Sequence, residues 1–230
     1  ILEGVRDQLK QDGDFSFNAL EVGPTAQEED FDYSGMSDEE FSVAVDDVSG
    51  KLLDPEKVKA ARQEELKVIS DYGVWRLITK EEARSRGLTP VDVRWVDINK
   101  GDEEHVEYRS RLVVKEFRRG DPDTQFAGTP PIEALRYQCS KLATDCYHDG
   151  RKRNMKMRFV DVRRAHFKAK ATREMTVRLP PELDDGIHVA ELIYSMYGCR
   201  DAALNWENEY SPWLESIGFI RGLNFPNGFL

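Results

Sequence analysis

The sequence predicts an α+β fold, and the order of its secondary-structure patterns is the main reason. Segments with the period of a strand and segments with the period of a helix follow one another along the 230 residues. They do not show the regular alternation that builds a parallel, doubly wound sheet. No internal repeat is visible. The length allows one or two domains with a sizeable core.

Acidic side chains are concentrated at the start of the chain. Residues 1–50 hold 14 of the 43 acidic side chains and 2 of the 33 basic ones, a net charge of −12. Residues 51–230 hold the other 29 and 31, a net charge of +2. This division predicts an acidic, largely disordered leader over residues 1–50 and a folded region over residues 51–230. The leader is either a solvated segment without a role of its own or a tail that recruits partners.

The first ordered element is expected to be a helix that begins near Asp54. Asp54 is a good N-cap, and Pro55 suits the first helical position. Apolar residues share one helical face as far as the stop signal Asp71-Tyr72-Gly73. Patterns of strand, helix, strand and strand follow at residues 74–78, 80–86, 92–98 and 106–117. The last two strands form a hairpin around the turn signal Lys100-Gly101-Asp102.

The second half of the chain begins with a helix signal at Thr129-Pro130-Pro131. Apolar residues from Ile132 to Cys146 recur there at steps of three and four. Strands are expected at residues 155–162, 174–179 and 188–193. The last helix is expected from about Asp201 to Ile217, with an apolar face and with Gly218 at its C-terminal cap.

Several protein classes are disfavoured by the sequence. No apolar run approaches the ~18–20 residues of a membrane span, and the start lacks the pattern of a secretory signal. The three cysteines, Cys139, Cys146 and Cys199, show no zinc-site spacing with the four histidines. We therefore expect reduced thiols in an intracellular protein. The chain begins with Ile, which suggests a piece of a longer polyprotein.

A strongly basic stretch contains a single carboxylate. Ten of the residues from Arg151 to Arg173 are Lys or Arg, and only Asp161, after Phe159-Val160, is acidic. Taken alone, such an Asp is commonly a strand-end cap or a member of an ion pair, and that alternative stays open. The basic surroundings attract polyanions, and Mg²⁺ prefers carboxylate and phosphate oxygens. The arrangement is therefore consistent with metal-assisted phosphoryl transfer.

From about Asp54 to its end, the sequence resembles the reverse transcriptase region of copia-type LTR retrotransposons. The blocks that carry the resemblance occur in the family's order: DPEKVKAARQEELKVISDYGVWRLI, RWVDINKGD with YRSRLVVKEFRRG, TQFAGTPPIEALR, FVDVRRAHF, EMTVRLPPEL and ELIYSMYGCRDAALNW. The resemblance implies the fingers and part of the palm of a right-hand polymerase. It also implies RNA-templated DNA synthesis inside a polyprotein that includes ribonuclease H and integrase, in a cytoplasmic particle or the nucleus.

The resemblance assigns roles to individual residues. Asp161 corresponds to the first palm carboxylate and, with the backbone carbonyl of Val162, would hold two Mg²⁺ ions. Lys100 and Arg111 stand where the fingers hairpin presents cations to a deoxynucleoside triphosphate. Tyr197-Gly198 stands where the family forms the floor under the nucleotide. The residues expected to contact the RNA template and DNA primer, or an RNA–DNA hybrid, are Arg151, Lys152, Arg153, Arg163, Arg164 and Lys168.

Three positions depart from the family pattern. His166 stands where an aromatic side chain crowds the sugar 2′-position and selects deoxynucleotides. Glu116 replaces a Gly, and we expect it to cost backbone energy or to repel phosphate. Asp201 replaces a Gln, and we expect it to be tolerated as the N-cap of the last helix.

The 230 residues contain no Asp-Asp pair in the context of the family's second carboxylate motif. A single carboxylate does not hold two Mg²⁺ ions in working geometry. The chain is therefore expected to be an N-terminal fragment that does not polymerise DNA alone. Two alternatives are a non-catalytic nucleic-acid-binding relic and an interaction protein that acts through its acidic leader.

Overall fold

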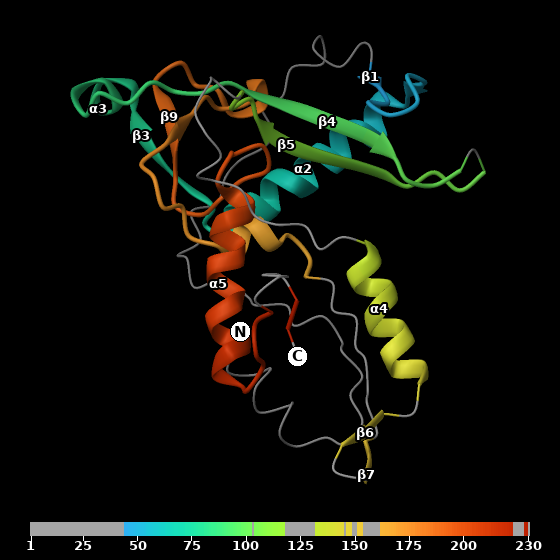
Figure 1. The fold of residues 1–230 in the computed structure, drawn as a ribbon. Helices are drawn as coiled ribbons and strands as arrows, with labels where there is room; N and C mark the ends of the chain where they lie inside the picture. Colours follow the sequence, from blue (N-terminus) through green and yellow to red (C-terminus); the bar gives the residue numbers. More distant parts are fainter. Residues whose placement is uncertain are drawn as a thin grey trace. The chain divides into compact units, whose positions relative to one another are not determined.

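The computed structural model describes residues 44–102, 104–117, 132–144, 146–148, 151–153, 162–222 and 228–229. The chain divides into two compact units (Figure 1). The larger unit comprises Val22–Gln125 and Ala165–Trp206, and the smaller unit comprises Ile1–Glu21, Phe126–Arg164 and Glu207–Leu230. Most of the predicted leader, residues 1–43, lies outside the described residues.

The larger unit begins with a hairpin that the sequence did not predict. Strand β1 (Ala44–Val45) pairs antiparallel with β2 (Leu52–Leu53). Between them, the Asp46 carboxylate accepts hydrogen bonds from the backbone N–H groups of Val48, Ser49 and Asn99, at 2.8, 2.7 and 2.7 Å. The expectation that order begins near Asp54 is therefore wrong. The composition predicts that these acidic residues are solvated, whereas the Asp46 carboxylate accepts backbone hydrogen bonds.

Helix α2 (Pro55–Asp71) begins and ends as predicted. The Asp54 side chain caps it by accepting a hydrogen bond from the N–H of Glu56 at 3.1 Å. After the helix, Gly73 has a φ of +57°, the left-handed conformation that favours glycine. The face toward the core carries the buried side chains Val58, Leu66 and Ile69.

The predicted hairpin consists of β4 (Val93–Asn99) and β5 (Tyr108–Val114), paired antiparallel. One of its faces packs on α2. Arg62 of the helix forms a 2.7 Å ion pair with Asp97, and its guanidinium lies 5.2 Å from the Trp95 ring centroid. Because side chains alternate along a strand, Arg109 and Arg111 of β5 lie on the opposite face.

A three-stranded antiparallel sheet joins distant parts of the larger unit. Its order is β3 (Trp75–Thr79), β9 (His188–Leu192) and β8 (Thr176–Val177), so the chain after α2 pairs with the chain before the last helix. Short helices α3 (Lys80–Ser85), η2 (Ala165–Lys168) and η3 (Pro181–Leu183) belong to the same unit. The strand predicted at 174–179 is shorter than expected.

The smaller unit contains α4 (Ile132–Ala143) and a hairpin of β6 (Cys146–His148) with β7 (Arg151–Arg153). The prediction that α4 reaches Cys146 is wrong, because the backbone of Cys146 pairs with Arg153. The predicted strand at 155–162 lies outside the described residues except for Val162, which is in neither a helix nor a strand.

Helix α5 (Ala202–Ser216) begins in the larger unit and continues into the smaller one, with bounds close to those predicted. Gly218 follows it with a φ of +101°. Within the described ranges, no helix is long and apolar enough to cross a membrane. Helices mixed with small antiparallel sheets are compatible with the predicted α+β class.

The hairpin at 44–53 predicts an acid-sensitive contribution to stability from Asp46. Hydrogen bonds from the N–H groups of Asn99 and Ser49 are the main reason why the Asp46 pKa falls from 3.8 to about 2. A lowered carboxyl pKa stabilises the folded state above the unfolded value of 3.8, and this contribution is lost as the pH falls through about 2.

We therefore expect Asp46→Asn to lower the urea midpoint at neutral pH, and the difference from wild type to shrink as the pH falls from 3.8 to about 2. Circular dichroism in a urea series at several pH values measures this. Asp71→Asn, at an exposed carboxylate on the last turn of α2, is the control. An equal difference at all pH values would contradict the prediction.

Candidate functional site

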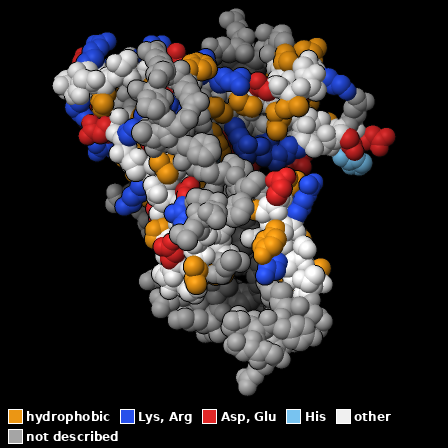
Figure 2. Space-filling model, viewed as in Figure 1, with side chains coloured by type: hydrophobic (Ala, Val, Ile, Leu, Met, Phe, Trp, Pro, Cys, Tyr) orange, Lys and Arg blue, Asp and Glu red, His pale blue; other side chains and the backbone are white. Residues whose placement is uncertain are grey.

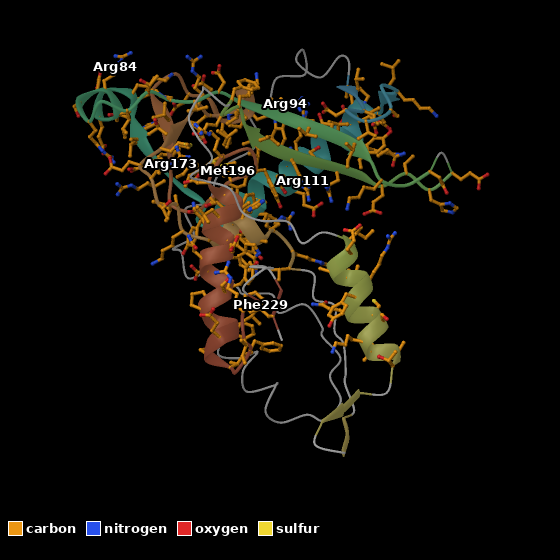
Figure 3. All side chains as sticks on the ribbon, in the orientation of Figure 1. Arg84, Arg94, Arg111, Arg173, Met196 and Phe229 are labelled. Atoms are coloured by element: carbon orange, nitrogen blue, oxygen red, sulfur yellow. The ribbon has the colours of Figure 1, made fainter. Side chains whose placement is uncertain are left out.

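Three of the predicted nucleotide-site residues lie together in the larger unit, although they come from distant segments. The Arg111 guanidinium, on β5, lies 4.7 Å from the ring centroid of Tyr197, which follows β9. The His166 ring, in η2, meets the Tyr197 ring edge-on at 5.4 Å and an interplanar angle of 81°. Figure 3 labels Arg111 on β5 and Met196, the neighbour of Tyr197 in the sequence.

Further aromatic side chains pack next to Tyr197. Phe167 is buried and lies 5.2 Å from Tyr197 and 6.5 Å from Tyr72, measured between ring centroids. Lys168 stands with its Nζ 5.5 Å from the Tyr72 ring, and burial lowers its pKa. Arg111, Tyr197, Phe167, Tyr72 and Lys168 thus form a row of rings with a cation at each end. We call this row, together with His166, the cation–aromatic row.

The turn at Tyr197-Gly198 lies directly against the end of β5. The carbonyl of Tyr197 accepts a 2.8 Å hydrogen bond from the N–H of Val114. Gly198 has a φ of +87°, and a Cβ at this position would lie 2.1 Å from the carbonyl oxygen of Val114. Only glycine satisfies both the left-handed backbone and the close approach. This contact holds the turn against the end of β5 and so keeps the Tyr197 ring next to Arg111.

The surroundings of His166 favour its neutral form. Burial lowers its pKa below 6.5, and the positive charge of Arg111 acts in the same direction, while a hydrogen bond with the Ala202 backbone opposes them. Its Nδ1 is buried and has no hydrogen-bond partner among the residues that the structure describes. A neutral imidazole carries one donor and one acceptor, unlike the apolar aromatic side chain of the family pattern.

Arg109 is a residue that sequence reasoning missed. It lies two positions from Arg111 on the same face of β5, and the alternation in Tyr108–Val114 is the signal that could have found it. Burial lowers the Arg109 pKa, and the like charge of Arg111 lowers it further. Neither guanidinium forms an ion pair with a carboxylate in the described part of the chain. Figure 2 shows Lys and Arg side chains gathered over β5.

Lys100 lies apart from Arg111. Its N–H donates to the carbonyl of Glu107 at 2.8 Å, just beyond the last strand pair, Asn99 with Tyr108. Glu107 directly precedes β5, and Arg111 follows it by four residues. This separation corresponds to about 13 Å at strand geometry. The hairpin therefore carries both cations, but it separates them along its length.

The predicted metal site lies largely outside the described residues. Asp161 is not among them, and of its two proposed ligand residues only Val162 is described. Within the described ranges, no group of three His, Cys, Asp or Glu side chains could hold a metal ion.

The residues predicted to contact nucleic acid lie in both units. Lys168 belongs to the larger unit, whereas Arg163 and Arg164 belong to the smaller one, where Arg164 has a φ of 52°. Arg151, Lys152 and Arg153 form β7, whose side chains lie outside the description.

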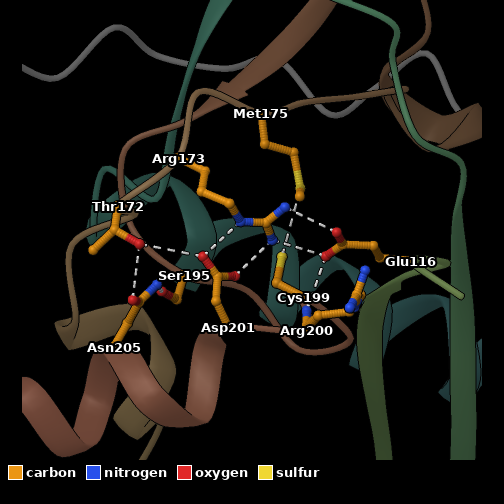
Figure 4. Close-up of polar contacts among 9 residues, drawn as sticks. All are labelled: Glu116, Thr172, Arg173, Met175, Ser195, Cys199, Arg200, Asp201 and Asn205. Carbon is orange, nitrogen blue, oxygen red and sulfur yellow. Dashed lines mark hydrogen bonds and ion pairs between the residues drawn. The ribbon is translucent and has the colours of Figure 1, made fainter. Parts of the chain in front are cut away.

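Glu116, expected from the sequence to cost backbone energy or to repel phosphate, is paired with a guanidinium. Its two carboxylate oxygens accept hydrogen bonds from the Arg173 guanidinium at 2.9 and 3.0 Å (Figure 4). One of them also accepts the N–H of Arg200 at 2.9 Å. The Asp201 carboxylate, on the other side, accepts from Arg173 at 2.9 and 2.8 Å. Asp201 directly precedes α5, and its carbonyl accepts the N–H of Asn205 at 2.8 Å.

These features define a class of protein. An antiparallel hairpin with two guanidinium groups that have no described carboxylate partner, one of them held against an aromatic row, is suited to a phosphate-bearing ligand. The reverse transcriptase (RNA-dependent DNA polymerase) family matches the chain over residues 72–224, more than half of its length. The chain belongs to this family. No curated protein and no solved structure shows a significant match.

Gly198 provides a test of the turn. We expect Gly198→Ala to destabilise the protein by roughly 1–3 kcal/mol for the left-handed backbone and by roughly another 1–3 kcal/mol for the clash with Val114. The matched control is Gly186→Ala, because Gly186 has a φ of +76° and open space around its Cβ position. Urea unfolding of both variants measures the difference. Equal losses would show that the turn does not lie tightly against β5.

Proposed function

We propose that the chain is the fingers and part of the palm of a copia-type retrotransposon reverse transcriptase. In the complete polyprotein, with ribonuclease H and integrase, it would carry out RNA-templated DNA synthesis by nucleotidyl transfer. The observation that carries the proposal is the family match over residues 72–224. All the ordered blocks of the copia pattern except the first, which begins at Asp54, lie within this range. The site of action would be a cytoplasmic particle or the nucleus.

The Arg111 end of the cation–aromatic row, with Tyr197 and His166, would bind the incoming deoxynucleoside triphosphate. Arg111 suits this role because a guanidinium makes paired hydrogen bonds to phosphate and has no described carboxylate partner to compete. Tyr197 would hold the plane of the Arg111 guanidinium, and Gly198 would form the floor beside it. His166 would face the sugar. Lys100, about 13 Å away along the hairpin, would reach a different part of the ligand or of the template.

Asp161 and the carbonyl of Val162 would hold Mg²⁺. When bound, Mg²⁺ supplies charge neutralisation at the phosphates of such a reaction. Arg151, Lys152, Arg153, Arg163, Arg164 and Lys168 would neutralise phosphates of the template and primer, which makes the affinity strongly dependent on salt.

Arg111→Met tests the triphosphate site. We expect it to weaken the binding of deoxythymidine triphosphate, in the presence of Mg²⁺, about tenfold or more, because one charged hydrogen-bonding group is lost. The affinity of Arg111→Lys should lie between those of the wild type and Arg111→Met, since Lys binds phosphate as a point charge. Arg84→Met, on α3 (labelled in Figure 3), removes the same charge from an exposed helix and is the control. Titration calorimetry measures each affinity, and equal losses in Arg111→Met and Arg84→Met would contradict the assignment.

Primer extension separates catalysis from binding alone. With a poly(rA) template and an oligo(dT) primer, we expect no extension by the 230-residue protein, because it has no second carboxylate motif, but salt-dependent binding of the hybrid. Extension that Asp161→Asn abolishes would overturn the expected inactivity and support the role of Asp161. Binding without extension, even after downstream residues with a second carboxylate pair are added, would favour a nucleic-acid-binding relic.

A further inference from the structure

Arg173 joins three segments of the larger unit. Its guanidinium forms two hydrogen bonds to Glu116, which follows β5, and two to Asp201, which precedes α5. Thr172, its neighbour, donates to Asn205 at 3.0 Å, and Asn205 donates to the buried Ser195 at 3.0 Å. We call the Glu116, Arg173 and Asp201 contacts the double bridge (Figure 4).

The double bridge encloses the turn that presents Tyr197. The turn runs from Tyr197 to Arg200, and Asp201 follows it immediately. At one end, the carbonyl of Tyr197 accepts the N–H of Val114. At the other end, the N–H of Arg200 donates to Glu116, two residues after Val114. Both ends of the turn are therefore held against the same stretch of chain, and Arg173 ties that stretch to Asp201.

The opposite charges of the three residues in the double bridge stabilise one another. Hydrogen bonds to Asp201 and Glu116 raise the pKa of Arg173. Burial alone would raise the pKa of Asp201, but Arg173 outweighs it, and the pKa is lowered. The side chains of Glu116 and Asp201 are only 15% and 8% exposed. Removal of Arg173 would leave two largely buried carboxylates without their cation on the two flanks of the turn.

We propose that Arg173 is a positioning residue of the nucleotide site, which it serves by holding the Tyr197–Arg200 turn against β5 so that the Tyr197 ring stays under the Arg111 guanidinium. Arg173 does not touch the ligand. Glu116 and Asp201 are both departures from the family pattern, and the bridge explains how this chain accommodates them together. This inference rests on the proposed triphosphate site.

A double-mutant cycle with Arg111 tests the proposal. We expect Arg173→Met to weaken the binding of deoxythymidine triphosphate about tenfold, within the range of coupling between residues in one network. In the Arg111→Met background, the same change should have little further effect, because the group that Arg173 positions is already absent. Arg173→Lys, which contacts a carboxylate as a point charge, should recover part of the affinity.

The control is Arg178→Met. Arg178 forms a 3.2 Å ion pair with Asp92 in the same unit, with both side chains exposed, and does not contact the turn. Circular dichroism confirms that each variant is folded under the binding conditions. If Arg173→Met does not fold, Glu116→Gln removes one half of the bridge and takes its place in the cycle. Additive losses in Arg173→Met and Arg111→Met would overturn the proposal, because they would show a role in stability alone.

A second readout needs no ligand, so that it separates this proposal from the proposed function. In protein with isotope-labelled tyrosine rings, the Tyr197 resonance, assigned with Tyr197→Phe, reports its contact with Arg111. We expect Arg173→Met to move this resonance toward its position in Arg111→Met, whereas Arg178→Met should leave it in place. An unmoved resonance would overturn the proposal even if the triphosphate binds. A moved resonance in a protein that binds no triphosphate would support the positioning and refute the nucleotide site.

Discussion

The pairing of β3 with β9 is the constraint on which the larger unit depends. It places Trp75 opposite Leu192, so that a segment next to α2 and a segment next to α5 become neighbours in one sheet. The hairpin of β4 and β5 lies between them in the chain, and the Tyr197–Arg200 turn follows β9 directly. Closing so long a loop costs entropy, which the buried side chains of this sheet, among them Val189 and Ala190, offset. The contact between Arg111 and Tyr197 exists because this pairing is made.

Charged side chains also join the elements of the larger unit. Arg62 links α2 to Asp97 of the hairpin, and Arg76 and Arg86 both reach the buried carboxylate of Glu191 on β9. The double bridge is the reverse arrangement, with the one guanidinium of Arg173 between two carboxylates. In each case the carboxylates are largely buried, so that removal of all their cationic partners would leave an uncompensated charge. The ion pairs of the larger unit therefore depend on the planar, forked geometry of the guanidinium group, which a Lys ammonium would not reproduce.

The sequence was most informative where the physical cause of a structure is local. Asp54 and Pro55 mark the start of α2, and the alternation in β5 marks the hairpin, because caps and periodicity act over a few residues. Cys146 continues a helical spacing, yet it joins a strand, because pairing with Arg153 overrides the pattern. The resemblance identified Arg111, Tyr197 and His166 individually, but it did not predict that their side chains contact one another. Arg173 could not be predicted, since its carboxylate partners are 57 and 28 residues away in the sequence.

The hairpin at the start of the described chain has a consequence for self-association. Side chains of Asp46 and Asp47 occupy the N–H groups of Asn99 and Asp97, which point away from β5. A strand with free groups along such an edge recruits strands from other molecules, and native proteins block this with charge or with covering segments. Asp46 and Asp47 provide the covering, because their carboxylates accept hydrogen bonds from the N–H groups of this edge. The part of the leader next to the fold thus acts as a guard against edge-to-edge aggregation of the hairpin.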